Sequence, residues 1–101
     1  MQRLVDALRP YQPERVYLFG SWARGEADEL SDLDIVILKR TTMPFFDRLR
    51  EAAKLLPPGT GGADIFVYTP EEFAAMREEG NAFAEMIHDE AQVIYERPTE
   101  G

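Results

Sequence analysis

The chain of 101 residues has no cysteine, few basic residues and no long apolar run. Without cysteine it can form neither a disulfide framework nor a thiolate zinc site. Its apolar stretches fall well short of the roughly 18 consecutive residues that a membrane-spanning helix needs. Residues 1–6 also lack the apolar segment that a signal peptide requires. We therefore expect a cytoplasmic protein that does not enter the membrane.

Basic residues are outnumbered by acidic ones. There are 11 Lys and Arg against 19 Asp and Glu, which gives a formal net charge of −8. The basic residues are scattered, whereas nucleic-acid binding depends on clustered Lys and Arg that neutralise phosphates. We therefore expect no stable nucleic-acid binding. A small phosphate-bearing molecule could still bind if a divalent cation supplied the positive charge, and the surplus of acid suits a basic protein partner.

Length and composition fit a single domain over residues 1–101, with residues 97–101 as a loose tail. Apolar periodicity and capping residues predict helices over 2–9, 41–56, 70–79 and 82–90, with a short helical turn at 21–24. Short apolar runs predict strands over 16–19, 32–39, 64–68 and 92–96. This order predicts an α/β or α+β fold, with a mixed sheet of about four strands and helices mainly on one face.

A glycine-serine turn follows the first expected strand. Gly20 can adopt a positive φ and lets the backbone approach a ligand closely. Ser21 offers a hydroxyl group and opens a helical turn whose amides can receive an anion. By itself such a pair is more often only a helix cap.

Two aspartates, Asp32 and Asp34, follow Ser21 after ten intervening residues and open the second expected strand. Because side chains alternate along a strand, both carboxylates point to one face, with β carbons about 6–7 Å apart. Like charges at this distance are unfavourable unless a cation is present, and carboxylate oxygens suit Mg²⁺ or Mn²⁺. The alternative is a loop-end cap at Asp32 and a solvent-facing Asp34. The neighbouring Gly-Ser turn favours the metal site.

Gly20-Ser21, ten residues and then Asp32-Leu33-Asp34 resemble the pattern of the nucleotidyltransferase superfamily that includes DNA polymerase beta and the kanamycin nucleotidyltransferases. The fuller run, G-S-x-A-R-G through S-D-L-D-I, is most similar to the minimal nucleotidyltransferases, which are stand-alone domains of about this length. The resemblance covers nearly the whole chain. It implies a polymerase beta-like nucleotidyltransferase fold.

The resemblance also implies roles for particular residues. Asp32 and Asp34 would bind the divalent metals that bridge the nucleotide phosphates, and Gly20 and Ser21 would hold the β- and γ-phosphates. Asp64, at the start of the third expected strand, would be the third metal-binding carboxylate and would help to deprotonate the attacking hydroxyl. The alternative for Asp64 is a turn aspartate at a strand end.

Three further residues have two possible roles each. Arg24 could contact a phosphate or pair with an acid of residues 26–32. Trp22 could stack on a base, although an aromatic side chain beside a turn more often has a packing role. His88 is expected to be structural or exposed.

The implied reaction transfers a nucleoside monophosphate from a nucleoside triphosphate to a hydroxyl group and releases pyrophosphate. AMP, transferred from ATP, is the expected group. Minimal members of the family are often encoded with a helical HEPN protein, a ribonuclease toxin, and act as its antitoxin, in some cases by transferring AMP to it. The resemblance therefore implies an enzyme that depends on Mg²⁺ or Mn²⁺ and acts on a HEPN-type partner.

Two alternatives stay open. The domain could neutralise a partner by contact without catalysis, or it could modify a small molecule such as an aminoglycoside. Larger relatives carry a second domain that closes over the nucleotide and presents the acceptor. Since this chain has no such domain, we expect a partner protein or a second copy of the chain to complete the site.

Overall fold

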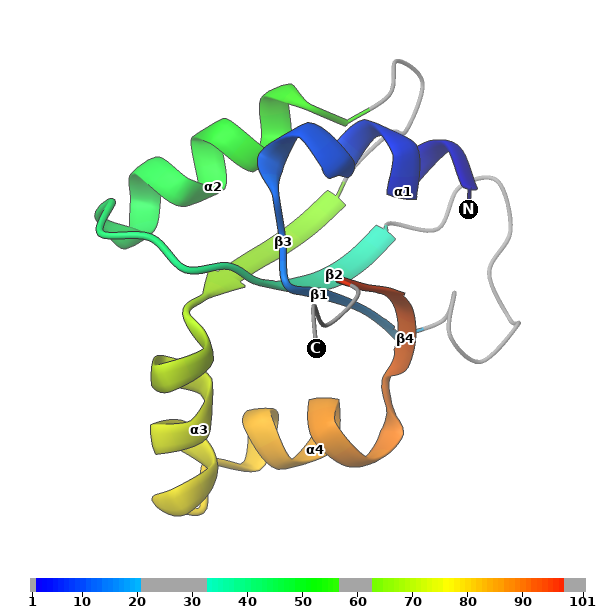
Figure 1. Cartoon of the computed structure of the whole chain (residues 1–101). Helices are drawn as coiled ribbons and strands as arrows, with labels where there is room; N and C mark the ends of the chain where they lie inside the picture. Colours follow the sequence, from blue (N-terminus) through cyan, green and yellow to red (C-terminus); the bar gives the residue numbers. More distant parts are fainter. Residues whose placement is uncertain (1, 21–32, 57–62, 98–101) are drawn as a thin grey trace.

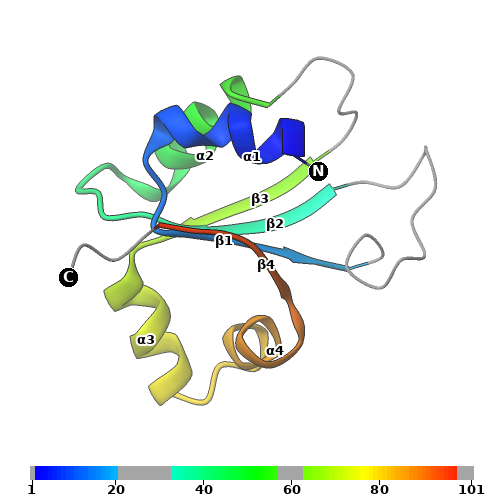
Figure 2. The same cartoon turned by 45° about the vertical axis from the view of Figure 1, so that its right-hand side comes forward.

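The computed structural model describes residues 2–20, 33–56 and 63–97. Within them, helices lie above and below one β-sheet (Figure 1; Figure 2). The helices are α1 (Gln2–Leu8), α2 (Phe45–Lys54), α3 (Pro70–Glu78) and α4 (Ala82–Glu90), with a 3₁₀ turn, η1, at Arg9–Tyr11. The strands are β1 (Arg15–Phe19), β2 (Leu33–Leu38), β3 (Ala63–Tyr68) and β4 (Gln92–Glu96). None of the helices in these ranges is both long and apolar enough to cross a membrane.

The four strands form one mixed sheet in the order β3-β2-β1-β4. The interior strand β1 is antiparallel to both of its neighbours, β2 and β4. β2 and β3 are parallel, and α2 connects them. The prediction of a mixed four-stranded sheet with α+β character is confirmed, while the helical turn expected at 21–24 lies outside the described residues.

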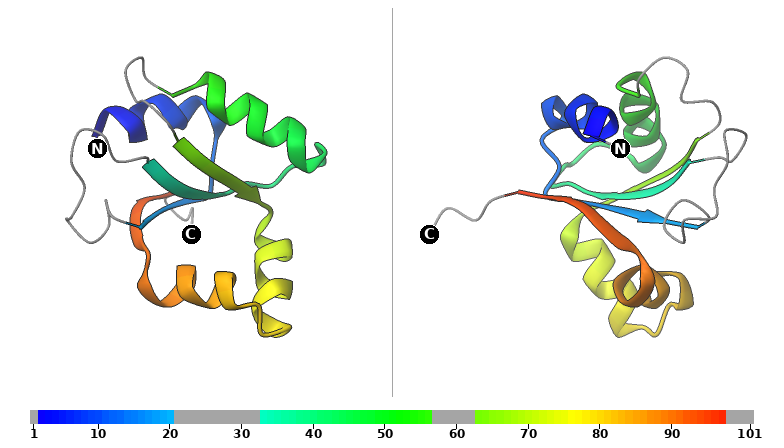
Figure 3. Two further views of the ribbon diagram at one scale, coloured as in Figure 1. Left: turned by 180° about the vertical axis from the view of Figure 1, so that it is seen from behind. Right: turned by 90° about the vertical axis from the view of Figure 1, so that its right-hand side faces the viewer.

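The helices differ from expectation in their placement, because they cover both faces of the sheet and not mainly one. α1 and α2 lie on one face, and α3 and α4 lie on the other (Figure 3, right-hand view). The reason lies in β2, where Ile35, Val36 and Ile37 are each 0% exposed. Ile35 and Ile37 pack in the cluster with α1 and α2, whereas Val36 packs with α3 and α4. A strand that is apolar on both sides must be covered on both sides.

The predicted helix at 41–56 begins only at Phe45. Pro44 has no backbone N–H and disfavours helical backbone at the residue before it, so the preceding residues stay outside the helix. α3, by contrast, begins as predicted. Thr69 Oγ1 accepts a hydrogen bond from the Glu72 amide at 3.0 Å, and a Glu72 carboxylate oxygen accepts one from the Thr69 amide at 2.8 Å.

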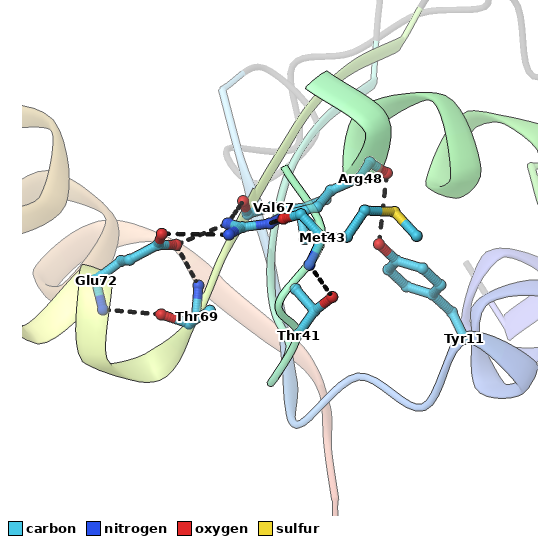
Figure 4. Close-up of polar contacts among 7 residues, drawn as sticks. All are labelled: Tyr11, Thr41, Met43, Arg48, Val67, Thr69 and Glu72. Carbon is cyan, nitrogen blue, oxygen red and sulfur yellow. Dashed lines mark hydrogen bonds and ion pairs between the residues drawn. The ribbon is translucent and has the colours of Figure 1, made fainter. Parts of the chain in front are cut away.

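A buried arginine, which the sequence did not predict, joins α2 to α3 (Figure 4). Arg48 is 6% exposed and is the single buried charged residue in the described ranges. Its guanidinium contacts both carboxylate oxygens of Glu72, at 2.7 and 3.3 Å. It also donates to the carbonyl oxygens of Met43 at 2.7 Å and Val67 at 3.2 Å. The Tyr68 carbonyl accepts a hydrogen bond from the Lys39 amide at 2.9 Å, so by alternation the Val67 carbonyl faces away from β2, at the edge of the described sheet, where Arg48 satisfies it.

We expect Glu72 to make part of the stability sensitive to acid. The hydrogen bonds from Arg48 hold the pKa of Glu72 below its ordinary value of 4.5, and bonding with Thr69 adds to this. Since the folded-state pKa is the lower one, the stabilisation is complete above the unfolded pKa and is lost as the pH falls through the folded pKa. Urea unfolding at pH values from neutral to about 3 should therefore show a smaller loss of stability for Glu72→Gln than for wild type. Parallel pH profiles for the two proteins would contradict this role.

Candidate active site

Three side chains form one row across the sheet at the end nearest to residue 20. Phe19 on β1 pairs with Asp34 on β2, and Asp34 pairs with Asp64 on β3. Directly opposed residues of neighbouring strands point to the same face, and the strands lie about 4.8 Å apart. The structure therefore brings two of the predicted metal ligands, Asp34 and Asp64, side by side. Asp34 is half-buried and Asp64 is exposed.

The alternation of side chains settles which face carries the two carboxylates. Val36 and Phe66 lie two residues after Asp34 and Asp64, and both pack in the cluster with α3 and α4. The carboxylates therefore belong to the same face. Each is the second residue of its strand, so the pair lies where β2 and β3 begin.

Gly20 lies directly against Asp34. Its φ is +75°, and a β carbon at this position would lie 2.3 Å from Asp34 Oδ2 and 3.2 Å from Asp34 Cγ. Glycine is therefore required for two reasons, the backbone angle and the space. The sequence predicted a close approach of Gly20 to a ligand. The structure adds a close approach to a carboxylate of the predicted metal site.

Phe19, a member of this row, forms an aromatic cluster with Phe66 and Phe83. Phe19 and Phe66 have ring centroids 6.4 Å apart, and Phe83 from α4 contacts both, at 5.6 and 5.2 Å. Sequence reasoning did not identify this cluster. Strand alternation could have placed Phe19 and Phe66 on one face, but the contact with Phe83 depends on how α4 packs under the sheet.

The other predicted site residues, Ser21, Arg24 and Asp32, lie outside the described residues, as does Trp22. Within the described ranges no group of three or more His, Cys, Asp or Glu is placed to hold a metal ion. His88 on α4 is exposed and contacts Asp89 at 3.0 Å, which agrees with a structural or exposed role.

The donor set fits a hard divalent cation. Mg²⁺ and Mn²⁺ prefer carboxylate oxygens and are usually held by one or two carboxylates together with phosphates and water. Asp34 and Asp64 are opposed in register on one face, so one cation could contact both carboxylates. The Gly20 backbone lies close against Asp34.

Comparison with known proteins identifies the family of this chain. The sequence profile described as "Polymerase beta, Nucleotidyltransferase" matches residues 2–100. The chain belongs to this nucleotidyltransferase family. Among curated proteins, none matches the chain significantly.

Two solved structures share the fold of this nucleotidyltransferase domain. One is described as the crystal structure of a toxin-antitoxin with AMP-PNP; it has a TM-score of 0.68 and 21% identity, covering 95% of this chain and 73% of that one. The other is a protein of Sulfolobus solfataricus proposed to be a nucleotidyltransferase; it has a TM-score of 0.60 and 21% identity, covering 95% of this chain and 76% of that one. At this identity the likenesses show the fold alone.

Gly80 allows the role of Gly20 in the nucleotidyltransferase domain to be measured. Both glycines have a positive φ, +75° and +77°, but a β carbon on Gly80 would meet nothing within 4 Å. Gly80→Ala should therefore cost only the backbone strain, about 1–2 kcal/mol. Gly20→Ala should cost more and should also weaken Mn²⁺ binding, because the added carbon displaces Asp34. Urea unfolding and Mn²⁺ titration of both variants test this. Equal stability losses, with unchanged metal affinity, would contradict the contact.

Proposed function

We propose that this chain is a metal-dependent enzyme that transfers a nucleoside monophosphate, AMP in the first instance, from a nucleoside triphosphate to a hydroxyl group. The observation that carries the proposal is the parallel register of Asp34 and Asp64 beside Gly20. Membership of the nucleotidyltransferase family supports it.

In this scheme Asp34 and Asp64, together with Asp32, would hold the divalent ions. When bound, these ions would neutralise phosphate charge and stabilise the attacking and leaving oxygens. Asp64 is exposed on an edge strand, so its carboxylate is open to an incoming acceptor. It would take the proton of the acceptor hydroxyl as the oxygen forms its bond to the α-phosphorus. The bond between the α-phosphorus and the bridging oxygen breaks, and pyrophosphate leaves with its electron pair.

We also propose that the acceptor belongs to a partner protein, and that the chain acts in the cytoplasm as the antitoxin of a helical HEPN-type toxin. One of the similar solved structures is described as a toxin-antitoxin with AMP-PNP, which supports a pairing of this kind. The resemblance to the minimal nucleotidyltransferases supports the HEPN identity of the partner. The formal charge of −8 suits a partner with a basic surface.

The test is a transfer assay with ATP labelled at the α-phosphate, Mg²⁺ or Mn²⁺, and the helical protein encoded beside this chain. We expect label on the partner with wild type and none with Asp32→Ala. The absence of label transfer with both Mg²⁺ and Mn²⁺ would refute the catalytic proposal. If a variant with Asp32, Asp34 and Asp64 all replaced by asparagine protected cells as well as wild type does, the chain would be an antitoxin that acts by contact.

A further inference from the structure

We propose that Phe83 on α4 is a positioning residue for the metal-binding carboxylates. It holds Phe19 and Phe66 together and thereby fixes Asp34 and Asp64 relative to each other. This inference rests on the proposed function, since it concerns the same metal site.

The aromatic cluster lies beside the carboxylate row. Phe19 is the direct partner of Asp34 across the antiparallel pair, and Phe66 follows Asp64 by two residues on the same face. Their ring centroids, 6.4 Å apart, therefore span the strand that carries Asp34. Phe83 closes the cluster, edge-on to Phe19 at 5.6 Å and tilted against Phe66 at 5.2 Å. The cluster therefore packs against β3, which carries Asp64, and against the β1 residue that pairs with Asp34.

The end of the sheet that carries the aspartates is supported from outside the sheet by α4. Phe19 is the last residue of β1, and the two aspartates are the second residues of β2 and β3. The row of carboxylates is thus supported by a full strand ladder on one side only. Phe83 supplies a contact from a distant part of the sequence, and it lies in the first turn of α4. The Asn81 side chain caps that turn by accepting a hydrogen bond from the Ala84 amide at 3.0 Å, so the start of the helix is fixed.

A second buried phenylalanine, Phe73, distinguishes positioning by Phe83 from ordinary packing. Phe73 on α3 belongs to the same hydrophobic cluster and is 5% exposed, more deeply buried than the half-buried Phe83. The Phe73 ring contacts Tyr17 and Tyr68, with ring centroids 6.0 and 6.5 Å away, and both lie away from the carboxylate row. If Phe83 only stabilised the core, truncating Phe73 would harm the metal site at least as much. If Phe83 positions the carboxylates, only the truncation of Phe83 should harm the metal site.

The experiment measures the affinity of the folded chain for Mn²⁺ alone, by calorimetric titration well below the melting temperature of each variant. Phe83→Ala should weaken Mn²⁺ binding about tenfold, the lower end of the range seen when groups that orient metal ligands are removed. Phe83→Tyr, which keeps the ring, should bind as wild type does. Phe73→Ala should melt at least as early as Phe83→Ala and yet keep its affinity within about twofold. If Phe83→Ala does not fold, Phe83→Leu takes its place and should still weaken binding at least about threefold.

The outcomes are distinct. Wild-type affinity in folded Phe83→Ala or Phe83→Leu, or an equal loss in Phe73→Ala, overturns the positioning role. A wild-type chain that binds no Mn²⁺ overturns both this inference and the metal-dependent function. Selective weakening in Phe83→Ala, in a chain that transfers no nucleotide, supports the positioning role and overturns the proposed enzyme.

Discussion

Replacing Asp64 by asparagine is expected to reduce nucleotidyl transfer by about 10³-fold or more, while the metal-free protein keeps nearly the stability of wild type. A 10³-fold loss corresponds to about 4 kcal/mol of transition-state stabilisation, the size expected when a ligand of a catalytic metal is lost. Stability is spared because Asp64 is exposed, and asparagine keeps nearly the same size and shape.

Thermal unfolding with and without Mn²⁺ provides the second measurement. A ligand that binds only the folded state stabilises it by about 2.7 kcal/mol at a concentration of 100 times its Kd. Wild type should show this increase in stability, and Asp64→Asn should lose most of it. Asp89→Asn, an exposed aspartate on α4 outside the carboxylate row, is the matched control and should behave as wild type does. Retained transfer together with a retained metal effect in Asp64→Asn would refute the assignment.

The elements of this fold were predictable because their signals are local. Thr69 and Pro70 mark the start of α3, and the β-branched run in β2 marks a strand. The same run, Ile35-Val36-Ile37, also carried the information that both faces are covered, since it is apolar at consecutive positions and not at alternate ones. The expectation of helices mainly on one face came from the order of the elements, which does not determine the side on which each helix packs.

The candidate site was predictable in its residues but not in its geometry. Asp34 and Asp64 were both expected at strand starts, but their direct opposition depends on the register of a parallel pair joined through α2. Gly20 was expected to allow a close approach, but its contact with Asp34 emerges only when β1 and β2 pair. Phe83 approaches from another part of the chain, so no local spacing could indicate it.

The burial of Arg48 was not predictable from the sequence, because an arginine on an amphipathic helix is normally exposed to solvent. Its partners come from the loop before α2, from the end of β3 and from the first turn of α3. Only the packed fold brings a carboxylate and two carbonyl groups around one guanidinium. The burial of a charge is tolerated when it is paired and hydrogen-bonded in this way.

Arg48→Ala is expected to destabilise the fold by about 2–4 kcal/mol. The substitution leaves the carbonyls of Met43 and Val67 without their donor and removes both contacts to Glu72. The estimate stays below the largest losses seen for buried pairs because the Glu72 side chain is 45% exposed and can be rehydrated. Arg50→Ala is the matched control on the same helix; its partner is Asp47 and its side chain is 75% exposed, so it should cost under about 1 kcal/mol.

A double-mutant cycle with Glu72→Gln divides the Arg48 effect between its partners. The ion pair is partly exposed, so its coupling should be about 1 kcal/mol, and most of the loss from Arg48→Ala should persist in the Glu72→Gln background. Urea unfolding of the four proteins gives these values. If Arg48→Ala lost no more stability than Arg50→Ala, the contacts of Arg48 with the two carbonyl groups would not be needed for stability. Because Arg48 bonds to the end of β3 opposite to Asp64, the folded variant should also keep its Mn²⁺ affinity, which separates stability from the site.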